Sequence, residues 1–289
     1  MVAKFNKILI LGSGTSTGIP TLTCNCRVCT SNDPKDRRLR SSIYLTTSRG
    51  KRILIDTTPD LRTQFLTNNI NEIDFVIITH DHADHIHGID DLRPFCFGEN
   101  PKNLDIHVSK YHAGTIKNRF QYIFNTRNIF SRNKPILGGG IPRLKLRQVT
   151  INKQNQKQMS LQNETFTFFH LPHNYTKTMC FVHENFAYLP DCYKISDSIV
   201  NFLRSLKLEI LIIDCLQHHK HDTHLEVERC FEYIKRIAPE SAGLIHMNHH
   251  LGHNELSKIA GDYFDFPVFP VYDGLTLQYA NRPSIHGEK

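Results

Sequence analysis

Short apolar, β-branched runs recur along most of the chain and are separated by polar or glycine-containing turns. Runs of this length and composition predict β-strands. Apolar residues at helical spacing between some of these runs predict helices over 61–68, 197–206 and 225–237, the last capped by Thr223 or His224. The strands are expected over 7–12, 42–47, 52–56, 75–79, 105–108, 143–149, 165–171, 178–182, 186–189, 209–214, 242–246, 268–271 and 276–279.

Strands and helices alternate along the whole chain, which favours a layered α/β or α+β fold. We expect one domain over residues 1–289, because single α/β domains of 200–250 residues or more are common. The stretch 111–163 contains three consecutive glycines, two prolines and a polar run, and it is interpreted as an insertion in that domain.

Composition is that of an ordinary soluble protein, with 39% hydrophobic and 22% charged residues. No apolar run approaches the roughly 18 residues that span a bilayer, and the run at 8–11 is shorter than the core of a signal peptide. We therefore expect a cytoplasmic protein without a membrane partner. The net charge of +7 favours partners that carry phosphate, although it is also compatible with a solubilising surface.

Histidine is unusually frequent, with 18 residues, and the chain also has eight cysteines. In a long chain without an export signal, this favours metal binding over disulfides. The segment from His80 to His85 reads His-Asp-His-Ala-Asp-His and directly follows a predicted strand. Side chains on a strand end and on the turn that follows it point in different directions. They could therefore bind two metal ions about 3.5–4 Å apart rather than one.

This motif resembles the signature of the metallo-β-lactamase superfamily. One residue before the motif and three after it match further positions of that superfamily, in the expected order along the chain. They are Asp56 at the end of a strand, His173 after Leu-Pro, Asp191 after Leu-Pro, and His246 at the end of a strand. The resemblance implies a four-layer αββα sandwich, and it implies that Asp56 orients ligands through hydrogen bonds.

The resemblance also implies a ligand set for two divalent ions, for which Zn²⁺, Mn²⁺ and Fe²⁺ are all suitable. Metal 1 takes His80, His82 and His173, metal 2 takes Asp84, His85 and His246, and Asp191 bridges both.

Three further segments resemble PhnP-type phosphodiesterases: 12–42 with its cysteines, 223–225, and 246–249 with the later Tyr272-Asp273-Gly274. That resemblance implies hydrolysis of a small, possibly cyclic, phosphodiester by metal-bridged hydroxide, with Asp84 and Asp191 at the metals and His224 as the general acid. The partner would then be a small phosphodiester, and a homodimer is a candidate assembly.

Other functions stay open at this stage. A nuclease similar to tRNA 3′-processing endonucleases would use the same metals and would bind RNA through its phosphates. A thioester hydrolase of the glyoxalase II type is disfavoured, because only 43 residues (289 − 246) follow His246. A non-catalytic binding module stabilised by metal is the remaining alternative.

A separate structural zinc site is predicted near the N-terminus. Cys24, Cys26 and Cys29 are spaced so that three thiolates can converge, and structural zinc needs a fourth ligand. His249 is the preferred fourth ligand, and the PhnP-type resemblance implies the same four residues. His250 and His253 are the competing choices.

Overall fold

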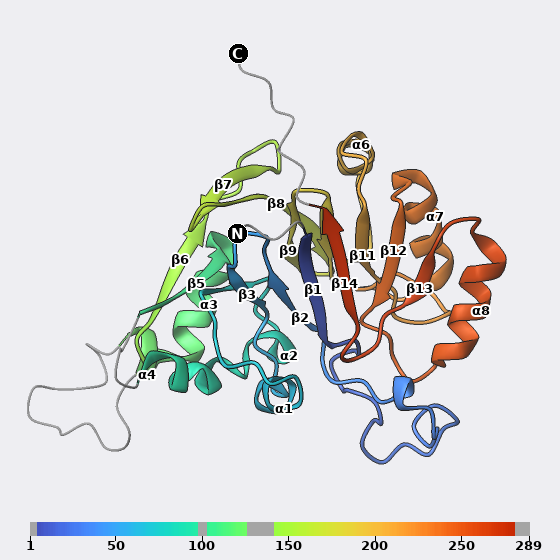
Figure 1. Cartoon of the computed structure of the whole chain (residues 1–289), viewed down its shortest axis with the longest axis horizontal. Helices are drawn as coiled ribbons and strands as arrows, with labels where there is room; N and C mark the ends of the chain where they lie inside the picture. The colour runs from blue at the N-terminus through green and yellow to red at the C-terminus, as the bar shows by residue number, and fades with distance from the viewer. Residues whose placement is uncertain (1–4, 98–102, 126–141, 281–289) are drawn as a thin grey trace, which may run out of the picture.

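Two seven-stranded mixed sheets pack face to face, and helices cover both outer faces (Figure 1). This architecture is seen in a computed structural model, which describes residues 5–97, 103–125 and 142–280. It is the four-layer αββα sandwich that the sequence predicts.

The first sheet has the strand order β14-β1-β2-β3-β4-β5-β6. Its β14, β1, β2 and β3 pair antiparallel, whereas β3 to β6 run parallel. The strands are β1 (Phe5–Gly12), β2 (Ser42–Thr46), β3 (Arg52–Ile55), β4 (Phe75–Ile78), β5 (Leu104–Ser109), β6 (Leu144–Val149) and β14 (Thr276–Ala280).

The second sheet has the order β13-β12-β11-β10-β9-β8-β7. Here β10 to β13 run parallel, and β7 to β10 pair antiparallel. The strands are β7 (Lys157–Leu161), β8 (Glu164–His173), β9 (Thr176–His183), β10 (Phe186–Leu189), β11 (Ile210–Asp214), β12 (Ser241–Ile245) and β13 (Val268–Pro270).

The helices form the outer layers (Figure 1). On the first sheet lie α1 (Leu61–Thr67), α2 (Ala83–Ile86), α3 (Lys110–Arg119) and α4 (Gln121–Phe124), with the 3₁₀ segment Ile89–Cys96. On the second sheet lie α6 (Asp197–Ser205), α7 (Val227–Ile237) and α8 (His253–Tyr263). A further 3₁₀ turn, Pro34–Asp36, lies in the long segment between β1 and β2.

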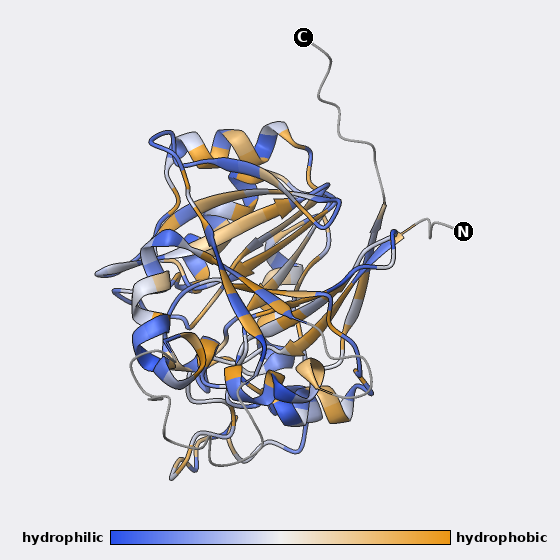
Figure 2. Ribbon diagram, turned by 90° about the vertical axis from the view of Figure 1, so that its left-hand side faces the viewer, coloured by the Kyte–Doolittle hydropathy of each residue, from blue (hydrophilic) through white to orange (hydrophobic). Residues whose placement is uncertain are grey.

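Apolar side chains fill all three interfaces between the layers. In Figure 2 the strands inside the sandwich are accordingly coloured mostly as hydrophobic. The central layer holds Phe75, Phe166 and Tyr188, each fully buried between the sheets. Burial of this extent stabilises the sandwich through the hydrophobic effect, at roughly 25 cal/mol per Å² of apolar surface. The strand ends that carry the polar site residues are thereby held on a rigid scaffold.

The helix that follows β11 begins later than the sequence predicts. It starts at Val227 with Glu226 at the N-cap, so the expected cap by Thr223 or His224 is wrong. The Thr223 hydroxyl pairs with the ring of His221, and the ring of His224 pairs with Asp214. Helices α3, α4 and α8 and strand β7 were not expected from the apolar pattern.

The stretch 111–163 joins the two sheets. It contains most of α3, all of α4, and the edge strands β6 and β7. Residues 126–141, which include its three consecutive glycines, lie outside the described residues. Across the described part of the chain, no helix has the length and apolar character needed to cross a membrane.

Candidate metal centres and catalytic cavity

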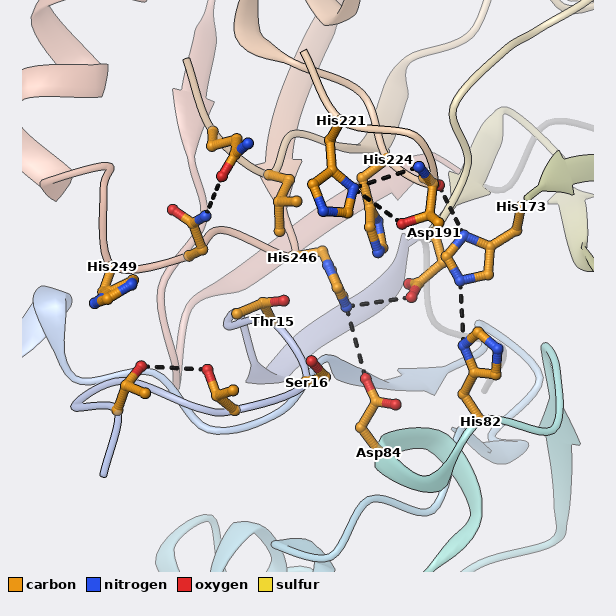
Figure 3. A pocket seen from close by; sticks show the side chains of 16 residues that line it. Thr15, Ser16, His82, Asp84, His173, Asp191, His221, His224, His246 and His249 are labelled. Carbon is orange, nitrogen blue, oxygen red and sulfur yellow. Dashed lines mark hydrogen bonds and ion pairs between the residues drawn. The ribbon is translucent and has the colours of Figure 1, made fainter. Parts of the chain in front are cut away.

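Polar residues at the ends of several strands meet at one edge of the sandwich. Asp56 follows β3, His80 follows β4 by two residues, Asp191 follows β10, and His246 follows β12. His173 ends β8. A cavity of about 400 Å³ opens there, and Figure 3 shows His82, Asp84, His173, Asp191 and His246 around it.

The first cluster consists of three histidines, His80, His82 and His173, whose donor atoms lie within 4.8 Å of one another. The Nε2 atom of His173 lies 3.2 Å from Nδ1 of His82. Nδ1 of His173 donates to the carbonyl oxygen of Thr223 at 2.8 Å. That bond leaves Nε2 of His173 unprotonated and free to bind a cation.

The second cluster consists of Asp84, His85, Asp191 and His246, all buried. One carboxylate oxygen of Asp191 lies 3.2 Å from Nε2 of both His85 and His246, and 3.8 Å from Nε2 of His80. Asp191 therefore lies between the two clusters, where a bridging ligand would have to be.

These donor atoms fit divalent ions. Nε2 of His80, His85 and His246 is buried in each case without a hydrogen-bond partner among the described residues. Leaving such atoms unpaired is costly unless a cation binds them. Zinc bonds of 2.0–2.1 Å in tetrahedral geometry place ligand atoms about 3.3 Å apart. The separations of 3.2–3.8 Å match this spacing.

Asp56 orients the second cluster from behind. Its carboxylate accepts hydrogen bonds from the backbone N–H of Thr79, the hydroxyl of Thr79 and Nδ1 of His85, at 2.7–2.8 Å. The bond to Nδ1 fixes the tautomer of His85, so that its Nε2 atom faces Asp84 and Asp191.

Charge is concentrated in this cluster. Burial alone would lower the pKa of His85, but the carboxylates of Asp191, Asp84 and Asp56 raise it well above its usual value. Burial would raise the pKa of Asp191, but His246 and His85 hold it well below its usual range. The carboxylates of Asp56, Asp84 and Asp191 surround His85, and this concentration of negative charge attracts a divalent cation.

Three site residues adopt left-handed backbone conformations, which are uncommon outside glycine. The φ angles are 65° at Asp56, 42° at Asp191 and 63° at His246. Each lies within two residues of the end of a strand, and Asp191 and His246 line the cavity, whereas Asp56 contacts His85 from behind. Such strain costs of order 1–3 kcal/mol per residue and is concentrated at functional sites in proteins.

His224 lies in the cavity wall beside residues of both donor clusters. Its ring centroid is 4.7 Å from that of His173 and 4.5 Å from that of His246. Its Nδ1 atom donates to Asp214 at 3.0 Å, which leaves Nε2 as the second, unpaired ring nitrogen. Burial would lower the pKa of His224, but Asp214 outweighs this and raises it.

Asp214 was missed in the sequence analysis. Besides His224, its carboxylate accepts hydrogen bonds from the backbone N–H groups of Cys192 and Leu225. It lies at the end of β11, between two strands whose ends also carry site residues. That shared position at the carboxyl edge of a parallel sheet is the signal that could have identified it.

A second candidate metal site lies on the segment between β1 and β2, drawn in blue in Figure 1. Sγ of Cys24, Cys26 and Cys29 lies 3.2, 3.5 and 3.6 Å from Nδ1 of His249. The backbone N–H of Cys29 lowers the pKa of Cys26, which favours the thiolate. The structure brings together the four preferred residues and not His250, whose side chain is exposed, or His253.

Asp273 holds the segment that runs between the two sites. It accepts hydrogen bonds from the N–H and hydroxyl of Ser13 and from the N–H of Leu39. A Cβ atom on Gly14 would lie 2.8 Å from Cβ of Arg38, so glycine permits the close approach there. The segment continues into Thr15, Ser16, Thr17 and Thr21, whose side chains line the cavity.

A family model described as "Beta-lactamase superfamily domain" matches residues 51–247. The "Octanoyltransferase" of Porphyromonas gingivalis is 34% identical over 271 residues, which is 93% of this chain and 51% of that protein. The chain therefore spans about half the length of this curated relative, and the activity in its name is a statement about that whole protein.

Two solved structures are similar over their full length. A diphosphatase described as new in the PhnP family has a TM-score of 0.81 and 30% identity, over 95% of this chain and 98% of that one. Zn²⁺-bound PqqB from Methylobacterium extorquens has a TM-score of 0.70 and 16% identity, over 94% of this chain and 99% of that one. The second likeness concerns the fold alone.

Proposed function

Since this chain belongs to the metallo-β-lactamase superfamily and resembles the PhnP family within it, we propose that it is a dinuclear, metal-dependent phosphodiesterase. The observation that carries the proposal is the arrangement of two donor clusters with Asp191 between them. A carboxylate that lies beside the donors of both clusters is suited to bridging two neighbouring ions.

The chemistry that such ions supply is activation of water and neutralisation of phosphate charge. His80, His82 and His173 would hold one ion, and Asp84, His85 and His246 would hold the other, with Asp191 bridging. Histidine and carboxylate donors accept Zn²⁺, Mn²⁺ and Fe²⁺.

His224 would donate a proton to the leaving oxygen. Its Nδ1–H is committed to Asp214, which fixes the ring so that Nε2 can carry the transferred proton. The residue lines the cavity beside His173 and His246, whose own ring nitrogens are committed to the metals in this proposal. Proton donation to a poor leaving group contributes about 10²–10⁴-fold.

The cavity wall opposite the metal ligands supports a small substrate with neutral polar groups. Thr15, Ser16, Thr17 and Thr21 contribute hydroxyls, and none of the described residues that line this cavity is a lysine or an arginine. Its volume of about 400 Å³ lies in the range of small-molecule sites. A sugar phosphodiester offers the matching hydroxyls.

The cluster of Cys24, Cys26, Cys29 and His249 would hold one structural zinc ion. Zn–S bonds of 2.3 Å and Zn–N bonds near 2.0–2.1 Å put sulfur and nitrogen about 3.6 Å apart in a tetrahedron. The separations of 3.2–3.6 Å agree with this. Four protein ligands leave no open position, so this ion would stabilise the segment without taking part in catalysis.

Hydrolysis of bis(p-nitrophenyl) phosphate by Mn²⁺- or Zn²⁺-loaded protein tests the proposal. We expect turnover that disappears in Asp191→Ala and persists in Asp262→Ala, an exposed carboxylate on α8 that serves as the control. A panel of 2′,3′-cyclic nucleotides, ribosyl 1,2-cyclic phosphates and precursor tRNA then identifies the substrate class. Absence of turnover from protein that holds both ions would contradict the proposal and favour a binding module.

RNA processing is the second candidate function for the same metal centre. A gel-shift assay with precursor tRNA distinguishes it from hydrolysis of a small phosphodiester. A nuclease that grips phosphates would bind tRNA with an affinity that falls steeply with salt. The small-substrate proposal predicts no shift at physiological salt and no cleavage.

A further inference from the structure

A second cavity, of about 500 Å³, lies outside the catalytic one. It forms where the end of β5, the start of α3, the segment after β6 and the strands β8 and β9 come together. Three lysines line it, Lys110, Lys153 and Lys177, and none of the lining residues that the structure describes is an aspartate or glutamate. The catalytic cavity has the opposite character, because carboxylates line it and lysines do not.

The three lysines of the second cavity have no carboxylate as a direct partner among the described residues, and Lys110 and Lys153 are exposed to solvent. Over the described ranges 5–97, 103–125 and 142–280, no carboxylate forms an ion pair with any of the three lysines. Nζ of Lys177 lies 4.5 Å from the ring centroid of Tyr111, a cation–π contact that holds the ammonium group beside the cavity. The backbone N–H groups at the start of the ten-residue helix α3 add further positive potential.

The cavity is built by fixed polar contacts. Ser109 caps α3 by accepting from the N–H of Tyr111, and its hydroxyl lies 2.7 Å from Nε2 of His170. Asn155 accepts from the N–H of His170 and donates to its carbonyl oxygen, at 3.0 and 2.8 Å. This pair of bonds anchors the turn that carries Lys153 to strand β8.

The surroundings of His170 show the same excess of positive charge. Burial, and then the positive charge of Lys177 and the ring of His112, lower the pKa of this histidine to about 3. It is therefore a neutral polar group in the wall, and the lysines carry the charge of the cavity.

The cavity is connected to the metal centre by short paths. His170 precedes the ligand His173 by three residues on β8, about 10 Å at 3.3 Å per residue. Independently, the ring of His112 bridges the carboxylate of Asp81, within the ligand motif, and the carbonyl oxygen of Lys177, at 2.9 and 2.6 Å.

We infer that this cavity is a second anion site, one that binds a phosphate or diphosphate group through Lys110, Lys153 and Lys177. Lysine ammonium groups bind phosphate as point charges, and hydroxyl and amide groups complete the hydrogen bonds. The group belongs either to the distal end of the substrate or to a separate phosphate compound. The existence of this anion site does not depend on the phosphodiesterase proposal, whereas its assignment to the distal end of the substrate rests on that proposal.

Binding of methylenebisphosphonate, whose P–C–P link resists hydrolysis, tests the site directly. Calorimetry on metal-loaded protein should resolve two classes of site, one at the metals and one in this cavity. The double variant Lys110→Gln/Lys153→Gln should lose the second class or weaken it about tenfold or more, because charge-assisted contacts are removed. Lys177 is kept because its backbone and its ring contact serve other groups.

The control is Lys258→Gln, which removes the same charge from an exposed position on α8. It should retain both classes, and thermal melting should show that all variants are folded. Equal binding by the double variant and the control would overturn the inference.

A kinetic arm identifies the source of the phosphate. The KM of the double variant is compared for thymidine 5′-(p-nitrophenyl phosphate) with and without a 3′-phosphate. A rise of KM for the 3′-phosphorylated compound alone would assign the cavity to a distal phosphate of the substrate. Unchanged KM for both compounds, together with lost bisphosphonate binding, would assign it to a separate phosphate compound.

Discussion

The two candidate metal centres differ in donor chemistry and in burial. The cluster around Asp191 is built from buried histidines and carboxylates: Asp84 and His85 lie on the short helix α2, and Asp191 and His246 lie just after strands. The cysteine cluster lies on an irregular segment, and Cys24, Cys26 and His249 are partly exposed. In the first cluster, strand ends and helix α2 place histidines and carboxylates around an open cavity. In the second cluster, three cysteines on a loop and His249 surround a single point. The first arrangement suits catalysis, and the second suits stabilisation.

Loss of a ligand to metal 2 should have the largest effect. Asp84→Ala should remove one equivalent of active-site metal and lower kcat/KM by more than the roughly 10²–10³-fold that a single transition-state hydrogen-bond donor contributes. Metal analysis and hydrolysis rates measure both effects. Wild-type rates in Asp84→Ala would show that the second cluster has no catalytic role, and Asp262→Ala is the matched control.

His224→Ala should have the next largest effect and should depend on the leaving group. We expect a loss of about 10²–10⁴-fold with alkyl leaving groups and a much smaller loss with p-nitrophenolate, which needs little protonation. Both metals should remain, because His224 is not among the proposed ligands. The control is His219→Ala on the same loop, whose side chain is exposed. Equal losses for both leaving groups would argue against proton donation.

The cysteine cluster should affect stability rather than rate. Cys26→Ser and His249→Ala should each lower the zinc content by one and the melting temperature by about 5 °C or more, since 1 kcal/mol corresponds to about 2–4 °C in larger domains. Turnover at 25 °C should remain within a few-fold of wild type. His250→Ala, which changes the exposed neighbouring histidine, should leave both the zinc content and the melting temperature unchanged. Loss of active-site metal in Cys26→Ser would refute the separation of roles.

The smallest effect concerns Asp273, which holds the segment between the two centres. Burial raises the pKa of Asp273 to about 6. The folded protein therefore takes up a proton between pH 6 and pH 4 that the unfolded chain, with a pKa near 3.9, does not. This contribution stabilises the folded state as the pH falls, by at most about 3 kcal/mol.

Urea unfolding of wild type and Asp273→Asn measures that contribution. The difference in the free energy of unfolding between the two proteins should shift in favour of wild type from pH 7 to pH 5. A difference that stays constant over this range would mean that the carboxyl of Asp273 titrates normally.

The sequence predicts the layered fold and the ligand motif because both depend on local patterns. Alternating apolar runs mark the strands, and the spacing of His80, His82, Asp84 and His85 is short and unusual. Asp273 was not assigned a role, since its partner Ser13 lies far away in the sequence, and Asp214 was not assigned one because its contact with His224 forms only when the loop after β11 folds back. The lysine-lined cavity could not be predicted either, because β5, β6 and β9 come together only in the folded chain.

The N-terminus of α7 shows a further limit of local reasoning. Thr223 and His224 precede an amphipathic segment and match the pattern of a helix cap, but tertiary contacts use them otherwise. His224 pairs with Asp214 in the cavity wall, and the helix begins three residues later. A residue whose side chain is held by a tertiary contact therefore does not form the helix cap that the local sequence predicts.

Anomalous diffraction from crystals of metal-loaded protein tests the central claim most directly. We predict two anomalous peaks about 3.5–4 Å apart, which mark two metal ions bridged by Asp191. The other ligands of the two ions should be His80, His82, His173, Asp84, His85 and His246. A single peak at this position, with Asp191 turned away from it, would contradict the binuclear account.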